Sequence, residues 1–257
     1  MALTDTHCHL DASEFDADRD KIVERAIAAG VTRIVVPSIS AENFSAVDAT
    51  CARYPLCRPA YGLHPVYGER HRPEDLLRLR AAITVARPLA LGEIGLDGWV
   101  RNVDFDVQTH YFIEQLKIAR DFDLPVLLHA RHANDEVMKQ LRRFDIRSGI
   151  AHAFNGSMQQ AELFIKQGFK LGFGGAFTYT RALNLRRLAK QLPLQAIVLE
   201  TDAPDMSPAW AHGQRNSPEY LAQIVAAMAA LREMDSDAIM TAAELNANAI
   251  LGGQNER

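Results

Sequence analysis

Two histidines one residue apart, close to the start of this chain, have the spacing of a metal-binding pair. His7 and His9 lie in the run 3–9, which we expect to form a strand. Side chains alternate between the two faces of a strand, so both imidazoles point the same way while Cys8 points to the other face. An isolated pair of this kind also occurs by chance. The other candidate ligands in the chain therefore decide what the pair means.

Four more residues with metal-binding side chains fall at the ends of other expected strands, namely Glu93, His129, His152 and Asp202. Each taken singly has an ordinary explanation, such as a hydrogen-bonded core histidine, a buried salt bridge or a helix cap. Taken together with the first pair, six ligand-type residues on five strand ends indicate a metal centre. They exceed one tetrahedral ligand set, and Glu93 could bridge two ions with one oxygen on each. The pattern favours two divalent metal ions.

Short apolar runs that alternate with amphipathic stretches predict the scaffold. We expect strands at 3–9, 33–37, 57–63, 89–94, 125–129, 149–152, 169–173 and 196–201. We expect helices at 18–29, 42–53, 73–83, 106–122, 134–144, 158–167 and 183–191, followed by 218–234 and 237–251. Eight strand-helix units predict an α/β fold, a TIM (β/α)8 barrel in one domain over 1–257 with an extra C-terminal helix. An open doubly wound sheet is the alternative. In a barrel all six candidate ligands would lie at the carboxyl rim, where barrel active sites form.

Composition narrows the class of protein further. No apolar run approaches the roughly 18 residues that span a bilayer, and no basic segment precedes the first strand, so we expect a soluble cytoplasmic protein without a membrane partner. Three cysteines without a Cys-x-x-Cys spacing indicate neither a disulfide framework nor a zinc ribbon. The net charge of −4 argues against a broad basic surface for duplex nucleic acid.

Six short blocks resemble the signature blocks of the TatD family, in the family's order and over nearly the whole chain. They lie at 5–10, 62–65, 92–97, 129–131, 152–156 and 200–204. These proteins are metal-dependent deoxyribonucleases and related hydrolases of the amidohydrolase superfamily. The resemblance implies a TIM barrel, a binuclear metal centre and hydrolysis of phosphodiester bonds. Carried over by residue, it assigns His7, His9 and Asp202 to one metal, His129 and His152 to the other, and Glu93 to the bridge between them.

The chemistry expected of such a centre needs no serine or cysteine nucleophile. A water between two divalent cations loses a proton near neutral pH and becomes a hydroxide that attacks phosphorus. Glu93 and Asp202 are the candidate catalytic residues, and Asp202 would act as both ligand and general base. Four imidazoles favour zinc, iron, nickel or manganese over magnesium, and Zn, Mn and Mg remain the candidate cofactors. Glu200 is expected to anchor a ligand histidine, with a plain buried ion pair as the alternative.

Three further residues are candidate substrate contacts. His64 ends the third expected strand, and Arg131 and Arg215 could pair with phosphate oxygens. The alternatives are a structural hydrogen bond for the histidine and a solvated surface charge for each arginine. Four other histidines are expected to face solvent: His71, His110, His132 and His212. Four aromatic residues near the rim could either stack an unpaired base or simply pack: Trp99, Phe154, Phe177 and Tyr179.

We weigh three classes of function. The first is a metal-dependent deoxyribonuclease that engages DNA transiently as its substrate, in single strands or at DNA ends. The second is a binuclear hydrolase of a small ester, lactone or amide; many such relatives bridge their metals with a modified lysine, whereas this chain has Glu93. The third, a metal-binding protein without catalysis, fits poorly because structural metal sites are closed by four ligands.

Overall fold

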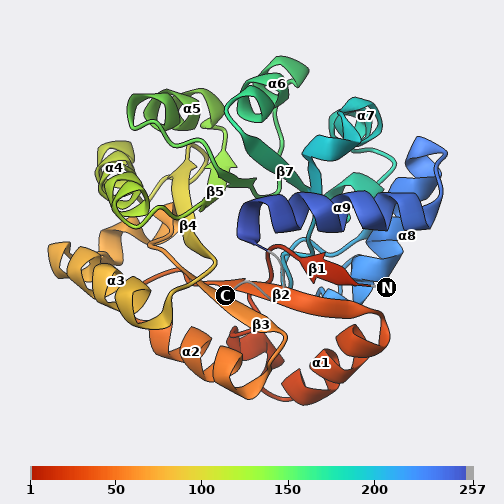
Figure 1. Cartoon of the computed structure of the whole chain (residues 1–257), viewed down its shortest axis with the longest axis horizontal. Helices are drawn as coiled ribbons and strands as arrows, with labels where there is room; N and C mark the ends of the chain where they lie inside the picture. The colour runs from red at the N-terminus through yellow and green to blue at the C-terminus, as the bar shows by residue number, and fades with distance from the viewer. Residues whose placement is uncertain (1, 253–257) are drawn as a thin grey trace.

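Eight parallel strands form a nearly closed barrel in the computed structural model, which describes residues 2–252 (Figure 1). Each strand pairs in parallel with the next along the chain. Between the last strand and the first, Thr6 N donates to Leu199 O at 3.2 Å and Asp202 N donates to His7 O at 2.9 Å. The predicted TIM barrel is therefore confirmed. The strands are β1 (Leu3–Asp5), β2 (Val31–Pro37), β3 (Cys57–Tyr61), β4 (Ala90–Asp97), β5 (Val126–Arg131), β6 (Gly149–Ala151), β7 (Phe169–Phe173) and β8 (Ile197–Leu199).

The helices surround this barrel and follow the expected ranges closely. They are α1 (Arg19–Ala28), α2 (Phe44–Arg53), α3 (Pro73–Ala86), α4 (Phe105–Asp121), α5 (Asn134–Arg143), α6 (Met158–Lys166), α7 (Leu183–Gln191), α8 (Leu221–Arg232) and α9 (Ser236–Leu251). Within residues 2–252, no helix combines the length and the apolar character needed to cross a membrane.

Seven of the eight strands, all except β7, differ in length from the prediction, and the differences in β1 and β4 concern the candidate ligands. β1 stops at Asp5, and the chain beyond it makes single bonds to its neighbours: Cys8 N donates to Val35 O of β2 at 3.0 Å, and His9 N donates to Ala203 O in the loop after β8 at 2.8 Å. β4 continues to Asp97, where it still pairs with Arg131 of β5. The carboxyl end of the barrel is thus built from strand ends and the first residues after them.

The inside of the barrel is filled at its amino end by the predicted extra C-terminal helix, which is confirmed. Side chains of the strands pack there against Ala247, Ile250 and Leu251 of α9. Figure 1 shows α9 lying across this end of the barrel. The strand residues in this layer are Val35, Ala60, Ala90, Leu127, Ile150 and Val198. Because this end is closed, the barrel is accessible only from the carboxyl ends of its strands.

We expect Arg33 to hold α9 in place. Its buried guanidinium donates to Asn248 Oδ1 at 2.7 Å, to Gly252 O at 2.8 Å and to Thr4 Oγ1 at 3.1 Å. Arg33→Met leaves these acceptors without a donor and should lower the free energy of unfolding by about 3 kcal/mol in urea titrations. Arg53→Met, which removes an exposed ion pair, is the matched control and should cost under about 1 kcal/mol. Equal losses in the two variants would contradict the prediction.

Candidate metal centre

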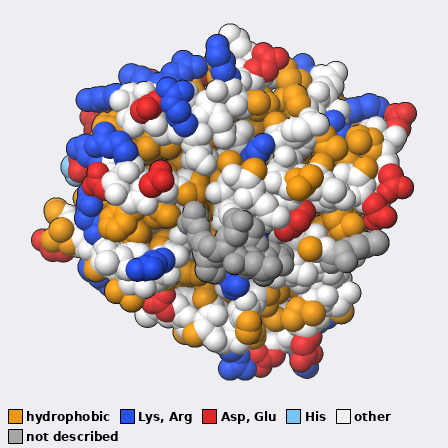
Figure 2. Space-filling model, viewed as in Figure 1, with side chains coloured by type: hydrophobic (Ala, Val, Ile, Leu, Met, Phe, Trp, Pro, Cys, Tyr) orange, Lys and Arg blue, Asp and Glu red, His pale blue; other side chains and the backbone are white. Residues whose placement is uncertain are grey.

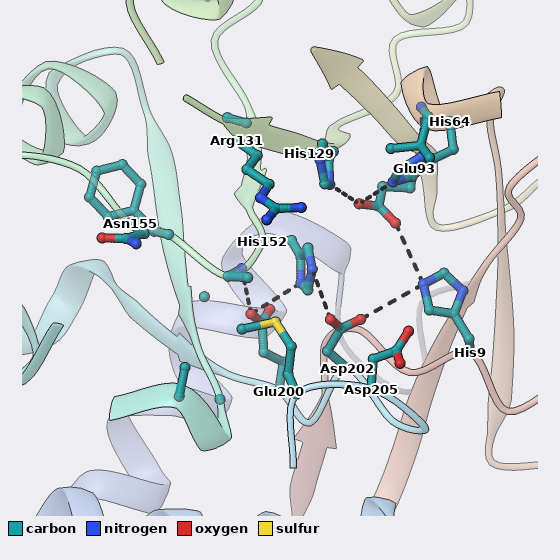
Figure 3. A pocket seen from close by; sticks show the side chains of 18 of the residues that line it. His9, His64, Glu93, His129, Arg131, His152, Asn155, Glu200, Asp202 and Asp205 are labelled. Atoms are coloured by element: carbon teal, nitrogen blue, oxygen red, sulfur yellow. Dashed lines mark hydrogen bonds and ion pairs between the residues drawn. The ribbon is translucent and has the colours of Figure 1, made fainter. Parts of the chain in front are cut away.

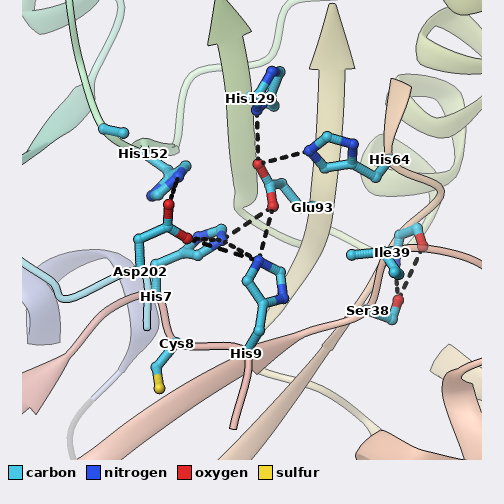
Figure 4. A network of polar contacts seen from close by, with 12 residues as sticks. His7, Cys8, His9, Ser38, Ile39, His64, Glu93, His129, His152 and Asp202 are labelled. Carbon is cyan, nitrogen blue, oxygen red and sulfur yellow. Dashed lines mark hydrogen bonds and ion pairs between the residues drawn. The ribbon is translucent and has the colours of Figure 1, made fainter. Parts of the chain in front are cut away.

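The predicted ligands converge at the carboxyl end of the barrel around one carboxylate, Glu93 (Figure 4). Its Oε2 lies 3.0 Å from His7 Nε2 and 3.5 Å from His9 Nε2. Its Oε1 lies 3.1 Å from His129 Nδ1 and 3.2 Å from His64 Nε2. Each oxygen of Glu93 therefore faces a separate pair of imidazole nitrogens, as a carboxylate that bridges two cations must.

Asp202 closes the first of these two groups. Its Oδ1 lies 3.9 Å from His7 Nε2 and 3.8 Å from His9 Nε2, and its Oδ2 lies 3.5 Å from His152 Nε2. The ring of His152 stacks on that of His7, with centroids 3.7 Å apart. His152 thus lies on the side of His7 and Asp202, whereas the resemblance assigns it to the ion of His129. The histidine that shares an oxygen of Glu93 with His129 is His64.

The donor set fits a divalent metal. Around a tetrahedral ion with bonds of about 2.0–2.1 Å, neighbouring ligand atoms lie about 3.4 Å apart. His7 Nε2 and His9 Nε2 are separated by 3.4 Å, and the ligand atoms of His7, His9 and Asp202 all lie within 4.8 Å of one another. Two basic nitrogens this close repel each other when both are protonated. A bound cation would remove that repulsion.

Charge within the centre also prepares it for a cation. Burial by itself would raise the pKa of Glu93, but His64 and His7 hold it well below its usual range. Burial would lower the pKa of His9, but its hydrogen bond to Glu93 and the charges of Glu93 and Asp202 raise it to about 9. At neutral pH the metal-free centre thus pairs ionised carboxylates with a protonated His9.

This raised pKa predicts how the stability of the metal-free protein depends on pH. A histidine whose folded pKa exceeds its usual 6.5 stabilises the fold below that value, and the contribution is lost as pH rises through the folded pKa. For His9 the loss between pH 7 and pH 9.5 is about 2 kcal/mol, and the raised pKa values of His129 and His152 act in the same direction. Urea unfolding in the presence of a chelator, at several pH values between 7 and 9.5, measures this loss of stability. A stability that rises with pH over this range would refute the assignment.

Asp97 links the centre to the loop above it. One oxygen, Oδ2, lies 2.9 Å from His129 Nε2, and the other, Oδ1, accepts from Trp99 N at 2.8 Å and Val100 N at 2.9 Å. Burial by itself would raise the pKa of Asp97, but these bonds lower it to about 2. Asp97 is assigned no role in the centre by the sequence analysis. The missed signal is its spacing from Glu93, since residues four apart on a strand share a face.

Asp97→Asn should therefore weaken the centre without unfolding the barrel. The amide group would either place its NH2 against His129 Nε2 or lose a hydrogen bond from Trp99 N or Val100 N. In both cases a charged partner no longer orients the imidazole. We expect metal affinity and activity to fall about 10- to 100-fold. Zinc titration and steady-state rates measure both quantities. Asp121→Asn, at an exposed ion pair with Arg80, is the matched control and should change neither.

A second carboxylate lies behind His152. Glu200 Oε1 is 3.1 Å from His152 Nδ1 and accepts from Ala153 N at 2.6 Å, which is the position that an anchor for this histidine requires. The strand beside it has no room for a side chain, because a Cβ at Gly172 would lie 2.2 Å from Glu200 Oε2. Asp5, which the sequence analysis did not single out, accepts from Thr201 N at 2.9 Å and so holds the strand end that carries Asp202.

A cavity of about 1430 Å³ opens over the centre and receives two of the three predicted substrate contacts (Figure 3). His64 and Arg131 line it. The third, Arg215, does not reach it: its Nη2 lies 2.7 Å from Asp18 Oδ2 and its guanidinium lies over the ring of Phe15. Arg215 is held by this ion pair, so its position does not support a contact with substrate.

The remaining histidines and aromatic residues divide by burial. His110, His132 and His212 are exposed as predicted, but the prediction for His71 is wrong. His71 is buried, and its Nε2 lies 2.9 Å from the carbonyl oxygen of His64. This contact holds the loop between the two residues. Phe154 and Phe177 are buried in the core and cannot stack a base, whereas Trp99 is exposed and Tyr179 is half-buried.

Comparison with known proteins identifies the family of this chain. The family model for TatD-related DNases matches residues 4–252. The chain belongs to the TatD family. A TatD relative from Escherichia coli, named uncharacterized metal-dependent hydrolase YjjV, is 43% identical over 93% of each chain. The TatD relative from Cronobacter sakazakii, named 3'-5' ssDNA/RNA exonuclease TatD, is 33% identical over 95% of each chain. The crystal structure of the Escherichia coli YjjV protein superposes with a TM-score of 0.94 at 41% identity and covers 98% of both chains. The protein is thus a metal-dependent hydrolase of the TatD family.

Proposed function

We propose that this TatD family hydrolase is a nuclease that cleaves phosphodiester bonds in single-stranded DNA or at DNA ends with two divalent ions, Zn, Mn or Mg. One observation carries the proposal: each carboxylate oxygen of Glu93 faces its own pair of imidazole nitrogens. Pairs of ions bridged in this way recur in phosphatases and nucleases. The name of the Cronobacter relative supports a nucleic-acid substrate.

Each residue of the metal centre has a separate role in the proposed hydrolysis. When bound, the ions would polarise the phosphoryl oxygen and make a water more acidic. Glu93 would hold both ions, and Asp202 would complete the site of His7 and His9. The pKa of Asp202, which burial would raise, is held below its usual range by His152 and His7, so its carboxylate can accept a proton from the attacking water. Arg131 would pair with a non-bridging phosphate oxygen.

The size of the cavity supports a nucleotide substrate over a small ester or lactone. Its volume of about 1430 Å³ exceeds the roughly 300–1,000 Å³ of sites for small molecules. The proposal places the enzyme in the cytoplasm, and its three cysteines are free thiols, as is usual in a reducing compartment.

The test uses metal-stripped protein that is resupplied with Mn, Mg or Zn and incubated with end-labelled single-stranded DNA. We expect metal-dependent release of nucleotides, and no release by Glu93→Ala, which serves as the control for contaminating nucleases. Equal activity in both proteins would refute the proposal. So would inactivity of the parent protein with metal demonstrably bound, and the search would then move to small esters, lactones and amides.

A further inference from the structure

Outside the metal centre, the walls of the cavity carry almost no positive charge. Among its described lining residues, Arg131 is the only lysine or arginine. Five carboxylates outside the metal centre line the same cavity and form what we call the acidic rim: Asp11, Glu14, Asp135, Glu136 and Asp205. Figure 3 shows Arg131 reaching toward His152, with Asp205 on the far side beside Asp202. Outside the metal centre, a polyanion that entered this cavity would meet one cationic side chain and five carboxylates.

The acidic rim is not neutralised by neighbouring cations. Within residues 2–252, only the carboxylate of Glu136 among the five has a lysine or arginine nitrogen within 4.0 Å, Lys139 Nζ at 3.1 Å. Arg19 and Arg215 donate to the backbone carbonyl oxygens of Asp11 and Glu14, and not to their carboxylates. Asp11 and Asp135 bond instead to the neutral amides of Asn43 and Gln160. The charge of the rim therefore acts on whatever approaches the centre.

Positive charge gathers at the other end of the barrel. Figure 2 shows the face covered by α9, where lysine and arginine side chains collect over α4 and α5. Arg142 and Arg143 end α5, and helices of a barrel run opposite to its strands, so these exposed cations lie away from the carboxyl rim. They cannot hold the strand whose end is in the cavity.

The single guanidinium in the wall is held in position. Arg131 lies over the ring of Trp99 at 5.3 Å from its centroid, and its Nη1 is 4.0 Å from Asp97 Oδ2. Trp99 in turn stacks on His132. The same Asp97 orients His129, so the cation and the metal ligand keep a fixed relation. One phosphate beside the centre therefore has a prepared partner.

We propose, on the basis of the nuclease function above, that the site recognises only the terminal linkage of a single strand, so that a dinucleotide is as good a substrate as a long strand. Arg131 holds one phosphate, and the acidic rim gives the phosphates of a longer tract no contact. Long strands are then cleaved only at their last linkage. Each phosphate contact of a single strand contributes a slope of about −0.7 to the dependence of log affinity on log salt. With one phosphate contact, affinity should fall about 3-fold when the salt concentration rises from 50 to 200 mM, whereas six contacts would lower it about 300-fold.

The test compares kcat/KM, per strand end and with Mn²⁺, for thymidylate strands of two, four and twenty nucleotides at both salt concentrations. We expect values within about 3-fold of one another and a loss of about 3-fold between the two salt concentrations. A rise of more than tenfold with length, or a loss above about 100-fold with salt, would overturn the inference alone. Failure to cleave any of the strands with metal bound would overturn the proposed function, and this inference with it.

A charge reversal in the acidic rim tests whether the rim is the reason that longer strands bind no better than a dinucleotide. Glu14→Lys should raise the ratio of kcat/KM for the twenty-nucleotide strand to that for the dinucleotide by about tenfold, because the added cation attracts the distal phosphates. Glu14→Gln should move the ratio in the same direction by less. Glu162→Lys makes the same charge change at an exposed site of α6 outside the cavity and should leave the ratio unchanged. Equal effects of Glu14→Lys and Glu162→Lys would contradict a role for the rim.

Discussion

Glu93→Gln should lower kcat for phosphodiester hydrolysis by about 10³-fold or more, while thermal unfolding stays cooperative. A glutamine keeps one oxygen but places an NH2 group where the second oxygen faces two imidazoles. That group cannot bind a cation, so the variant would hold at most one ion where we propose two for the parent protein. Losing a charge-stabilising ion removes several kcal/mol in the transition state, and each 1.4 kcal/mol is about tenfold in rate.

Steady-state kinetics and metal analysis of the same preparations check this result. Glu162→Gln, an exposed carboxylate of α6, is the matched control and should keep both the rate and the metal content of the parent protein. Retention of two ions and of kcat within tenfold in Glu93→Gln would show that Glu93 does not bridge.

Raising the pH from 6 to 9 should strengthen metal binding by about 100-fold or more. A ring nitrogen must lose its proton before it can bind a metal, and each displaced proton changes affinity about tenfold per pH unit below its pKa. His9 has its pKa raised to about 9, and His152 has its pKa raised well above the usual value by Glu200 and Asp202, although burial of each opposes the rise. Metal and protons therefore compete throughout this range.

Competition with a zinc-binding dye, corrected for the titration of the dye, measures the affinity. Calorimetry in buffers of different ionisation enthalpy counts the protons released on binding. Asp202→Asn should reduce the pH dependence, since it removes a carboxylate that raises the pKa of both His9 and His152. An affinity that is independent of pH, with no proton release, would contradict the prediction.

Most of the strands and the first ligand pair could be predicted from the sequence, because they depend on the pattern of residues along one segment. The alternation of strands and helices predicted all eight strands. The spacing of His7 and His9 predicted that their side chains lie on the same side, and their ring nitrogens lie 3.4 Å apart. The ends of strands were less accessible. β1 ends at Asp5 and β4 reaches Asp97 because pairing with neighbouring segments, which are distant in sequence, decides where a strand stops.

The sequence by itself determined the kinds of side chain at the carboxyl rim, since composition and spacing assign ligand-type residues to strand ends whatever their exact packing. Only the tertiary structure decided which of them meet. It put His64 beside His129 on one oxygen of Glu93, and tied Arg215 to Asp18 away from the cavity. The physical reason is that hydrogen bonds and ion pairs between separate strands depend on distances of about 3 Å, which periodicity along one strand does not encode.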